Sequence, residues 1–234
     1  MLKLVRNADK SIILICFERG KVNYSVKEIF YSLQGEGAQV GRPAVFCRFS
    51  GCNLWSGLEK DRDSSICGFC DTDFVGTNGA EGGVFGSSGE LAAAIDSMWL
   101  PFEKEKARKL VVCTGGEPLL QLDAPLLDAL HERDFEIAAE TNGTLLPPEG
   151  LDWICVSPKA NTELKLRKGN ELKIVFPQEN LSPEAFRHFE FEHFFLQPMD
   201  GPDLEANIQK TVEYVMANPG WRLSLQIHKI LGIP

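Results

Sequence analysis

The chain has 234 residues, of which 44% are apolar and 24% charged, and this length suits one α/β domain with a substantial core. Its formal net charge of −9 argues against a nucleic-acid partner, because proteins that bind the phosphate backbone usually carry a basic face. No stretch approaches the roughly 20 apolar residues that cross a bilayer, and no signal-peptide cleavage site is found, so we expect a cytoplasmic protein without a membrane partner.

Residues 1–22 show no periodicity that ties them to the rest of the chain, so we interpret them as an N-terminal extension of unknown role ahead of one domain, 23–234. Residues 68–89 are rich in Gly, Asp, Ser and Thr and should form a loop. Short apolar runs predict strands at 44–49, 110–113, 135–139, 153–156, 172–176, 194–196 and 223–227. Amphipathic periodicity predicts helices at 88–98, 119–133, 183–189 and 204–216. This alternation favours a parallel sheet, open or curled into a barrel.

Polar and glycine-rich clusters follow these predicted strands along the chain. They occupy residues 50–53, 114–118, 140–143, 157–159, 197–200 and 228–229. In parallel α/β sheets and barrels, active sites gather at the C-terminal ends of the strands. We therefore expect the clusters to line a single site.

Three of the seven cysteines, Cys52, Cys67 and Cys70, have the spacing C-x14-C-x2-C. A C-x2-C pair suits zinc and an iron–sulfur cluster equally, and with Cys47 the chain has enough thiolates for a structural zinc site. Cys47 lies within an apolar strand, however, where cysteine is usually a small buried hydrophobic residue. This favours a cluster held by the other three thiolates, which leaves one iron open for a further ligand.

Several motifs beyond the cysteines carry a family resemblance. They are residues 28–37, 50–54, 67–73, 114–118, 140–143, 157–159 and 197–200. With these motifs the chain, from about residue 23 onward, resembles the 7-carboxy-7-deazaguanine synthases, a family of radical S-adenosylmethionine (SAM) enzymes. Most radical SAM proteins have C-x3-C-x2-C, and the longer spacing here is similar to a variation within this family.

The resemblance implies an α/β fold that is a single-domain, incomplete (β/α) barrel and forms a homodimer. It also implies a carbon–nitrogen lyase of queuosine biosynthesis, which converts 6-carboxy-5,6,7,8-tetrahydropterin to 7-carboxy-7-deazaguanine with loss of ammonia. The implied cofactors are a 4Fe–4S cluster, SAM and Mg²⁺, and an external protein would donate single electrons.

The resemblance further implies roles for individual residues. Cys52, Cys67 and Cys70 would ligate the cluster and thus act in catalysis, and Thr72 would ligate Mg²⁺. SAM would contact Phe69, Cys70, Asp71, Gly116, Ser157, Pro158, Lys159, Gln197, Pro198, Met199 and Asp200. The pterin would contact Leu33, Gln34, Gly35, Arg48, Thr114, Glu140, His228 and the terminal carboxylate of Pro234. Arg48 also lies in an otherwise apolar strand, where a guanidinium needs a partner, and the substrate carboxylate would supply one.

Two alternatives share parts of this pattern. A radical SAM activase, which makes a glycyl radical on a partner protein, would have the cluster and SAM motifs without the pterin set. A zinc-stabilised binding module would have the cysteines without catalysis. Iron content after anaerobic reconstitution separates the module from both enzymes, and turnover of the pterin separates the synthase from the activase.

Overall fold

A computed structural model of the chain describes residues 2–6, 12–16, 23–100 and 108–234, with side chains described from residue 23 onward. Strands β1 (Leu2–Arg6) and β2 (Ile12–Cys16) pair antiparallel in a sheet of their own. These strands lie in the predicted N-terminal extension, and the division of the chain at residue 22 stays a prediction.

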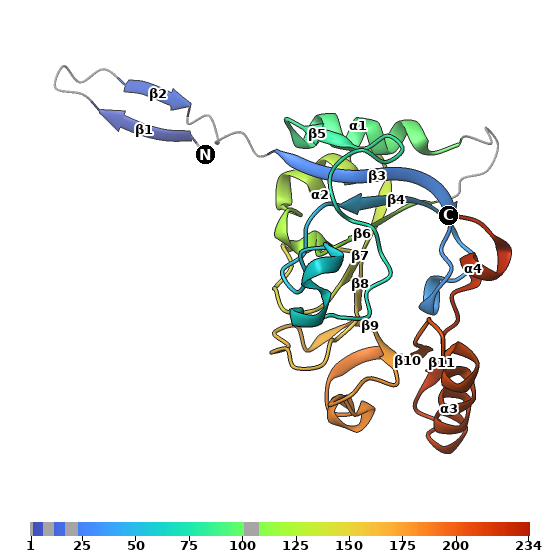
Figure 1. Ribbon diagram of the computed structural model, residues 1–234. Helices are drawn as coiled ribbons and strands as arrows, with labels where there is room; N and C mark the ends of the chain where they lie inside the picture. Colours follow the sequence, from blue (N-terminus) through green and yellow to red (C-terminus); the bar gives the residue numbers. More distant parts are fainter. Residues whose placement is uncertain (1, 7–11, 17–22, 101–107) are drawn as a thin grey trace.

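The remaining described strands form one nine-stranded sheet in the order β11-β10-β9-β8-β7-β6-β4-β3-β5 (Figure 1). They are β3 (Tyr24–Leu33), β4 (Pro43–Phe49), β5 (Gly83–Phe85), β6 (Lys109–Gly115), β7 (Phe135–Thr141), β8 (Trp153–Val156), β9 (Lys168–Phe176), β10 (Glu190–Pro198) and β11 (Arg222–Leu223). Strand β4 and strands β6 to β11 run parallel, whereas β3 is antiparallel to both β4 and β5. Because β11 and β5 are the two edges, the sheet is not closed, and the predicted incomplete barrel is confirmed.

Three of the four α-helices, α1 to α3, pack on the outer face of this curved sheet, whereas α4 contributes no residue to either core (Figure 1). The α-helices are α1 (Ser88–Met98), α2 (Ala124–His131), α3 (Leu204–Ala217) and α4 (Ile227–Leu231), and the 3₁₀ turns are η1 (Gly37–Gln39), η2 (Glu59–Ser64), η3 (Pro118–Leu120) and η4 (Pro183–Phe186). Helix α1 begins where the Ser87 hydroxyl accepts a hydrogen bond from the Glu90 amide. It buries Leu91 and Ile95 in a core formed by α1, α2 and strands β3 to β7, and a second core lies between α3 and strands β8 to β10.

Three predicted elements differ from the structure. The helix predicted at 119–133 is divided into η3 and α2, because Asp123 caps a new helix that Pro125 pre-organises. The helix predicted at 183–189 is only the turn η4, which is too short to sustain an α-helix and is held by the buried Phe186.

The C-terminal strand predicted at 223–227 ends at Leu223, after two parallel pairs with β10. The chain then leaves the sheet and forms α4. His228 and Lys229 therefore lie on a helix and not after a strand. Strand β3 was not predicted, since a register shift between Val26 and Glu28 breaks its period of two. Strand β5 lies within residues 68–89, which were expected to form a loop.

Candidate active site

A cavity of about 390 Å³ opens at the C-terminal ends of the parallel strands. Of the predicted site residues, it is lined by Leu33, Gln34, Gly35, Arg48, Cys52, Cys67, Phe69, Cys70, Asp71, Thr72, Thr114, Gly116, Glu140, Ser157, Lys159, Gln197, Pro198, Met199, Asp200, His228 and Pro234. Pro158 does not line it; this residue is buried beneath the cavity wall, where its carbonyl accepts a hydrogen bond from Gln178. The fold thus brings residues of all the predicted polar clusters together in one cavity, as expected.

The period of two along each strand explains which side chains reach this cavity. On β4, Val45, Cys47 and Phe49 pack into the core beneath the helices, so the intervening Arg48 points to the inner face. The same alternation places Lys173 of β9 in the cavity, between Leu172 and Ile174 of the core. Polar side chains that face inward near the C-terminal ends of the strands therefore form much of the cavity wall.

The three predicted cluster ligands line the cavity and lie near one another. The Cys52 sulfur accepts a hydrogen bond from the Leu54 amide at 3.4 Å, and the Cys70 sulfur accepts one from the amide of Thr72. A hydrogen bond from the Cys67 thiol lowers the pKa of Cys70 to about 6, and the same bond raises the pKa of Cys67. The site thus favours thiolate at one ligand and supplies amide donors to sulfur, as iron–sulfur sites do.

The donor set fits an open cubane better than a zinc knuckle. Cys47, the fourth thiol of the zinc alternative, is fully buried in the helix-side core and does not line the cavity. Among the described residues, no three His, Cys, Asp or Glu side chains lie close enough together to hold a single metal ion. A cubane does not need such convergence, since each thiolate binds a different iron atom.

The long loop between Cys52 and Cys67 is held by Arg62. Its guanidinium donates to the carbonyls of Gly68 at 2.8 Å and Cys70 at 3.1 Å, and lies 4.2 Å from the centre of the Trp55 ring. These contacts fix the backbone on both sides of Phe69. Arg62 therefore holds the long loop between Cys52 and Cys67 in a defined conformation next to Cys70.

Gly116 joins the cluster loop to β6. A Cβ atom on Gly116 would overlap with the carbonyl oxygen of Gly51, so only glycine allows this approach. The next amide, that of Glu117, donates to the same carbonyl at 2.9 Å. The position of Cys52 is thereby coupled to the end of β6.

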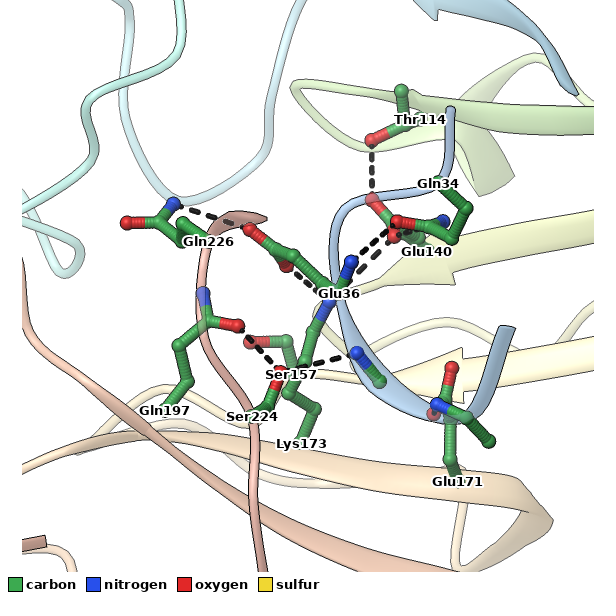
Figure 2. A network of polar contacts seen from close by, with 12 residues as sticks. Gln34, Glu36, Thr114, Glu140, Ser157, Glu171, Lys173, Gln197, Ser224 and Gln226 are labelled. Carbon is green, nitrogen blue, oxygen red and sulfur yellow. Dashed lines mark hydrogen bonds and ion pairs between the residues drawn. The ribbon is translucent and has the colours of Figure 1, made fainter. Parts of the chain in front are cut away.

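Another part of the cavity wall is a polar network around the buried Lys173 (Figure 2). The ammonium pairs with Glu36 and lies 3.6 Å from Glu140. The Glu140 carboxylate also accepts hydrogen bonds from Gln34 at 3.2 Å and from Thr114 at 3.0 Å. Two carboxylates, one ammonium and two neutral groups therefore hold one another in place at the predicted pterin end.

The charges of this network are mutually stabilised. Burial alone would raise the pKa of Glu36, but the Lys173 ammonium outweighs it and the net shift is downward. Burial would likewise lower the pKa of Lys173, but Glu140 and Glu36 raise it well above its ordinary value. Glu36 and Lys173 are therefore both charged at neutral pH.

Arg48 has a partner within the protein, which the sequence interpretation did not include. Its Nε lies 2.7 Å from Glu28 Oε1, directly across the β3–β4 pair. Both side chains line the cavity. The guanidinium is thus oriented by Glu28 through Nε, and a guanidinium held in this way keeps further N–H donors that can bind a carboxylate.

The residues at the sites predicted for SAM differ in what their side chains contact. Lys159 Nζ donates to both the hydroxyl and the carbonyl of Ser157, each at 2.7 Å. The carboxylates of Asp71 and Asp200 both bind Lys229. The side chains of Lys159, Asp71 and Asp200 are therefore held by contacts within the protein, and these contacts stabilise the cavity wall.

Glu117 is completely buried beneath this wall. Its carboxylate accepts hydrogen bonds from the Leu119 amide, the Thr141 hydroxyl and the Asn142 amide, at 2.8 to 3.0 Å. Burial raises the pKa of Glu117 even though these hydrogen bonds oppose the rise. Glu117 thus ties the end of β6 to the end of β7.

We expect Glu117→Gln to lower the free energy of unfolding by about 1–3 kcal/mol, because the amide nitrogen cannot accept a hydrogen bond from the donor it faces. Urea unfolding at neutral pH measures this loss. Glu213→Gln, on the exposed face of α3, is the matched control and should change stability by less than about 0.5 kcal/mol. Equal losses in both variants would refute the role of Glu117.

The chain is similar to curated proteins over most of its length. It is 59% identical over 213 residues to the 7-carboxy-7-deazaguanine synthase of Caulobacter vibrioides, covering 91% of this chain and 100% of the relative. It is also 59% identical to the synthase of Bordetella pertussis, covering 90% and 99%. The chain belongs to the 7-carboxy-7-deazaguanine synthase family.

A solved structure, that of QueE from Escherichia coli, matches with a TM-score of 0.65 and 28% identity, covering 88% of this chain and 95% of that one. No protein-family model matches the chain. The relatives and the structure confirm the predicted family, fold and enzyme class, and with the family its 4Fe–4S cluster and SAM. No described helix has both the length and the apolar character needed to span a membrane.

The sequence interpretation missed several residues of the cavity. Glu36, Lys173, Gln226 and Lys229 all line it. Glu36 could have been found within the motif 28–37, and Lys173 is a charge in an apolar strand, the same signal that identified Arg48. Lys229 belongs to the polar cluster 228–229 that was expected at the site, although no individual role was assigned to it. Gln226 gave no such signal, since its position depends on where the chain leaves β11.

Proposed function

We propose that this chain converts 6-carboxy-5,6,7,8-tetrahydropterin to 7-carboxy-7-deazaguanine and ammonia. The observation that supports this most strongly is the cavity itself, whose wall contains both three cysteine thiols and the Glu36–Lys173–Glu140 network. Substrate and products balance without a net oxidant, because the product differs from the pterin by one molecule of ammonia. The pathway is that of 7-deazapurines such as queuosine.

Cys52, Cys67 and Cys70 would hold the cluster, with SAM next to it. When bound, these cofactors supply one-electron radical chemistry, and the protein supplies orientation and exclusion of water. The predicted SAM residues form the adjacent wall, where Gly116 permits close approach of a ligand to the backbone. This arrangement would hold the reactive part of SAM inside the cavity.

The substrate would lie between this wall and the buried network. Arg48, oriented by Glu28, would bind the pterin carboxylate, while Gln34 and Glu140 offer acceptors to ring N–H groups. His228 and Pro234 close the same end, and the Pro234 carbonyl accepts a hydrogen bond from Ser32 at 2.7 Å. Recognition would therefore combine one bidentate ionic contact with a fixed set of polar groups.

Mg²⁺ completes the proposal, with Thr72 as a ligand. Thr72 lines the cavity two residues after Cys70, and magnesium favours oxygen ligands and retains waters. We further propose a homodimer in the cytoplasm that receives single electrons from another protein. These points rest on the family resemblance.

The substrate assignment is tested by anaerobic turnover of reconstituted, reduced protein with 6-carboxytetrahydropterin and with the analogue that lacks the carboxylate. We expect product from the first only. Arg48→Met should lower kcat/KM for the carboxylated substrate by roughly 10²-fold or more, as expected for loss of a buried charged contact of about 3 kcal/mol. No turnover of either compound by the wild type would refute the proposed function.

A further inference from the structure

Lys229 of α4 connects two segments at the cluster end of the cavity. Its Nζ lies 2.6 Å from Asp71 Oδ2 and also pairs with the Asp200 carboxylate. Asp71 follows the cluster ligand Cys70, and Asp200 follows the end of β10. One ammonium therefore fixes two segments that are predicted to contact SAM.

The same short helix also contacts the pterin end. The Ile227 amide donates to the Gly35 carbonyl at 3.0 Å, next to Gln34. The ring of His228 packs so closely on Gly35 that a Cβ atom there would overlap with it. His228 itself lines the cavity, so α4 forms part of the wall at this end too.

Residues 224–234, which we call the C-terminal crossover, link β11, at one edge of the open sheet, with β3, the strand next to the other edge (Figure 1). At one end the Ser224 amide donates to the Leu196 carbonyl at 2.9 Å, and the Ser224 hydroxyl bonds Gln197 (Figure 2). At the other end the Pro234 carbonyl is bound by Ser32 of β3. Lys229 is the ionic contact between this crossover and the cluster loop.

We propose that Lys229 is a positioning residue that couples the binding of SAM to the binding of the pterin through the C-terminal crossover. This inference rests on the proposed function. A ligand that orders the segments of Asp71 and Asp200 also orders Lys229, and with it His228 at the pterin end. Because such coupling is reciprocal, each ligand raises the affinity for the other by the same factor.

The electrostatics of the contact suit this role. Burial alone would lower the pKa of Lys229, but hydrogen bonds to Asp200 and Asp71 raise it, so the ammonium stays charged at neutral pH. The exposed fractions of the side chains are 38% for Lys229, 52% for Asp71 and 35% for Asp200. Because these groups remain in contact with water, the ion pairs are weak and are weakened further by salt. A contact of modest strength can open and close as ligands exchange.

The test is equilibrium binding of SAM to the reconstituted, unreduced protein, with and without 6-carboxytetrahydropterin. In the wild type we expect the pterin to lower the Kd for SAM by about 5-fold or more. In Lys229→Met this factor should fall to within about twofold of unity, and Lys229→Arg should restore most of it. Lys210→Met, an exposed lysine of α3, is the matched control and should retain the wild-type factor.

The outcomes separate the inference from the function on which it rests. If the wild type binds no SAM at all, the proposed function fails. If SAM binds and the factor is the same in the wild type and in Lys229→Met, or if the wild type has no coupling, the inference is overturned. Hydrogen exchange gives a second readout. SAM alone should protect the amides of residues 227–231 in the wild type and in Lys229→Arg, but not in Lys229→Met. Equal protection in all three proteins would also overturn the inference.

Discussion

Replacing Cys67 by Ala should abolish turnover and most of the iron content. The thiol is one of the three that line the cavity and can bind the cluster, so the variant loses one of three ligands. Changes in the outer shell of a metal site commonly cost about 10–100-fold in affinity or activity, and loss of a direct ligand should exceed this range. Iron and sulfide analysis after anaerobic reconstitution, together with product formation, measures both effects.

Cys113→Ala is the matched control for this prediction. Cys113 is another buried thiol, but it packs in the core beneath the helices and does not line the cavity. We expect the control to lose about 1 kcal/mol of stability and to keep its iron and its turnover. An active Cys67→Ala enzyme with a full complement of iron would contradict the assignment of the ligands.

Replacing Lys173 by Met should destabilise the protein by about 3–5 kcal/mol at neutral pH, the range for breaking a buried ion pair by removing one partner. The side chain is only 4% exposed, and its loss leaves Glu36 and Glu140 without a cation. Chemical denaturation gives the size of the effect. Lys168→Met, on the exposed part of the same strand, should change stability by less than about 0.5 kcal/mol.

The pH dependence of this loss has a definite sign. In the wild type the pKa of Glu36 is below its ordinary value, so its stabilising contribution is present above the unfolded pKa and disappears as pH falls through the folded pKa. Without Lys173, burial should raise the pKa of Glu36, and stability should instead fall as pH rises through the carboxylate range. The deficit of Lys173→Met should therefore be smaller near pH 4.5 than at pH 8; an equal deficit at both would refute the ion-pair explanation.

The fold could be predicted from the sequence where apolar runs were short and bounded by polar clusters. Strand β4 and helix α1 match their predicted limits within one residue. Strand β3 could not be found by periodicity, because a bulge interrupts its alternation. The segment 223–227 alternates as a strand does, yet after Leu223 it turns toward Gly35, and only the tertiary structure decides this.

The candidate site was predictable wherever one strand sets the position of a side chain, as for Arg48 and Thr114. It was not predictable where two distant segments meet. Glu28 binds Arg48 through a strand pair that the sequence does not reveal, and Lys229 binds Asp71 and Asp200 from a short helix where the sequence predicted only a polar cluster after a strand. Pairing partners of charged groups depend on tertiary contacts, and a motif shows only one member of each pair.

The central claim is that three thiolates of this chain hold an iron–sulfur cluster whose open iron binds SAM. Its most direct test is oxygen-free reconstitution of the wild-type protein, followed by metal analysis and incubation with SAM, the pterin and a strong reductant. We expect about four irons per chain, cleavage of SAM and formation of 7-carboxy-7-deazaguanine. A colourless protein that holds one zinc, takes up no iron and leaves SAM intact would contradict the claim.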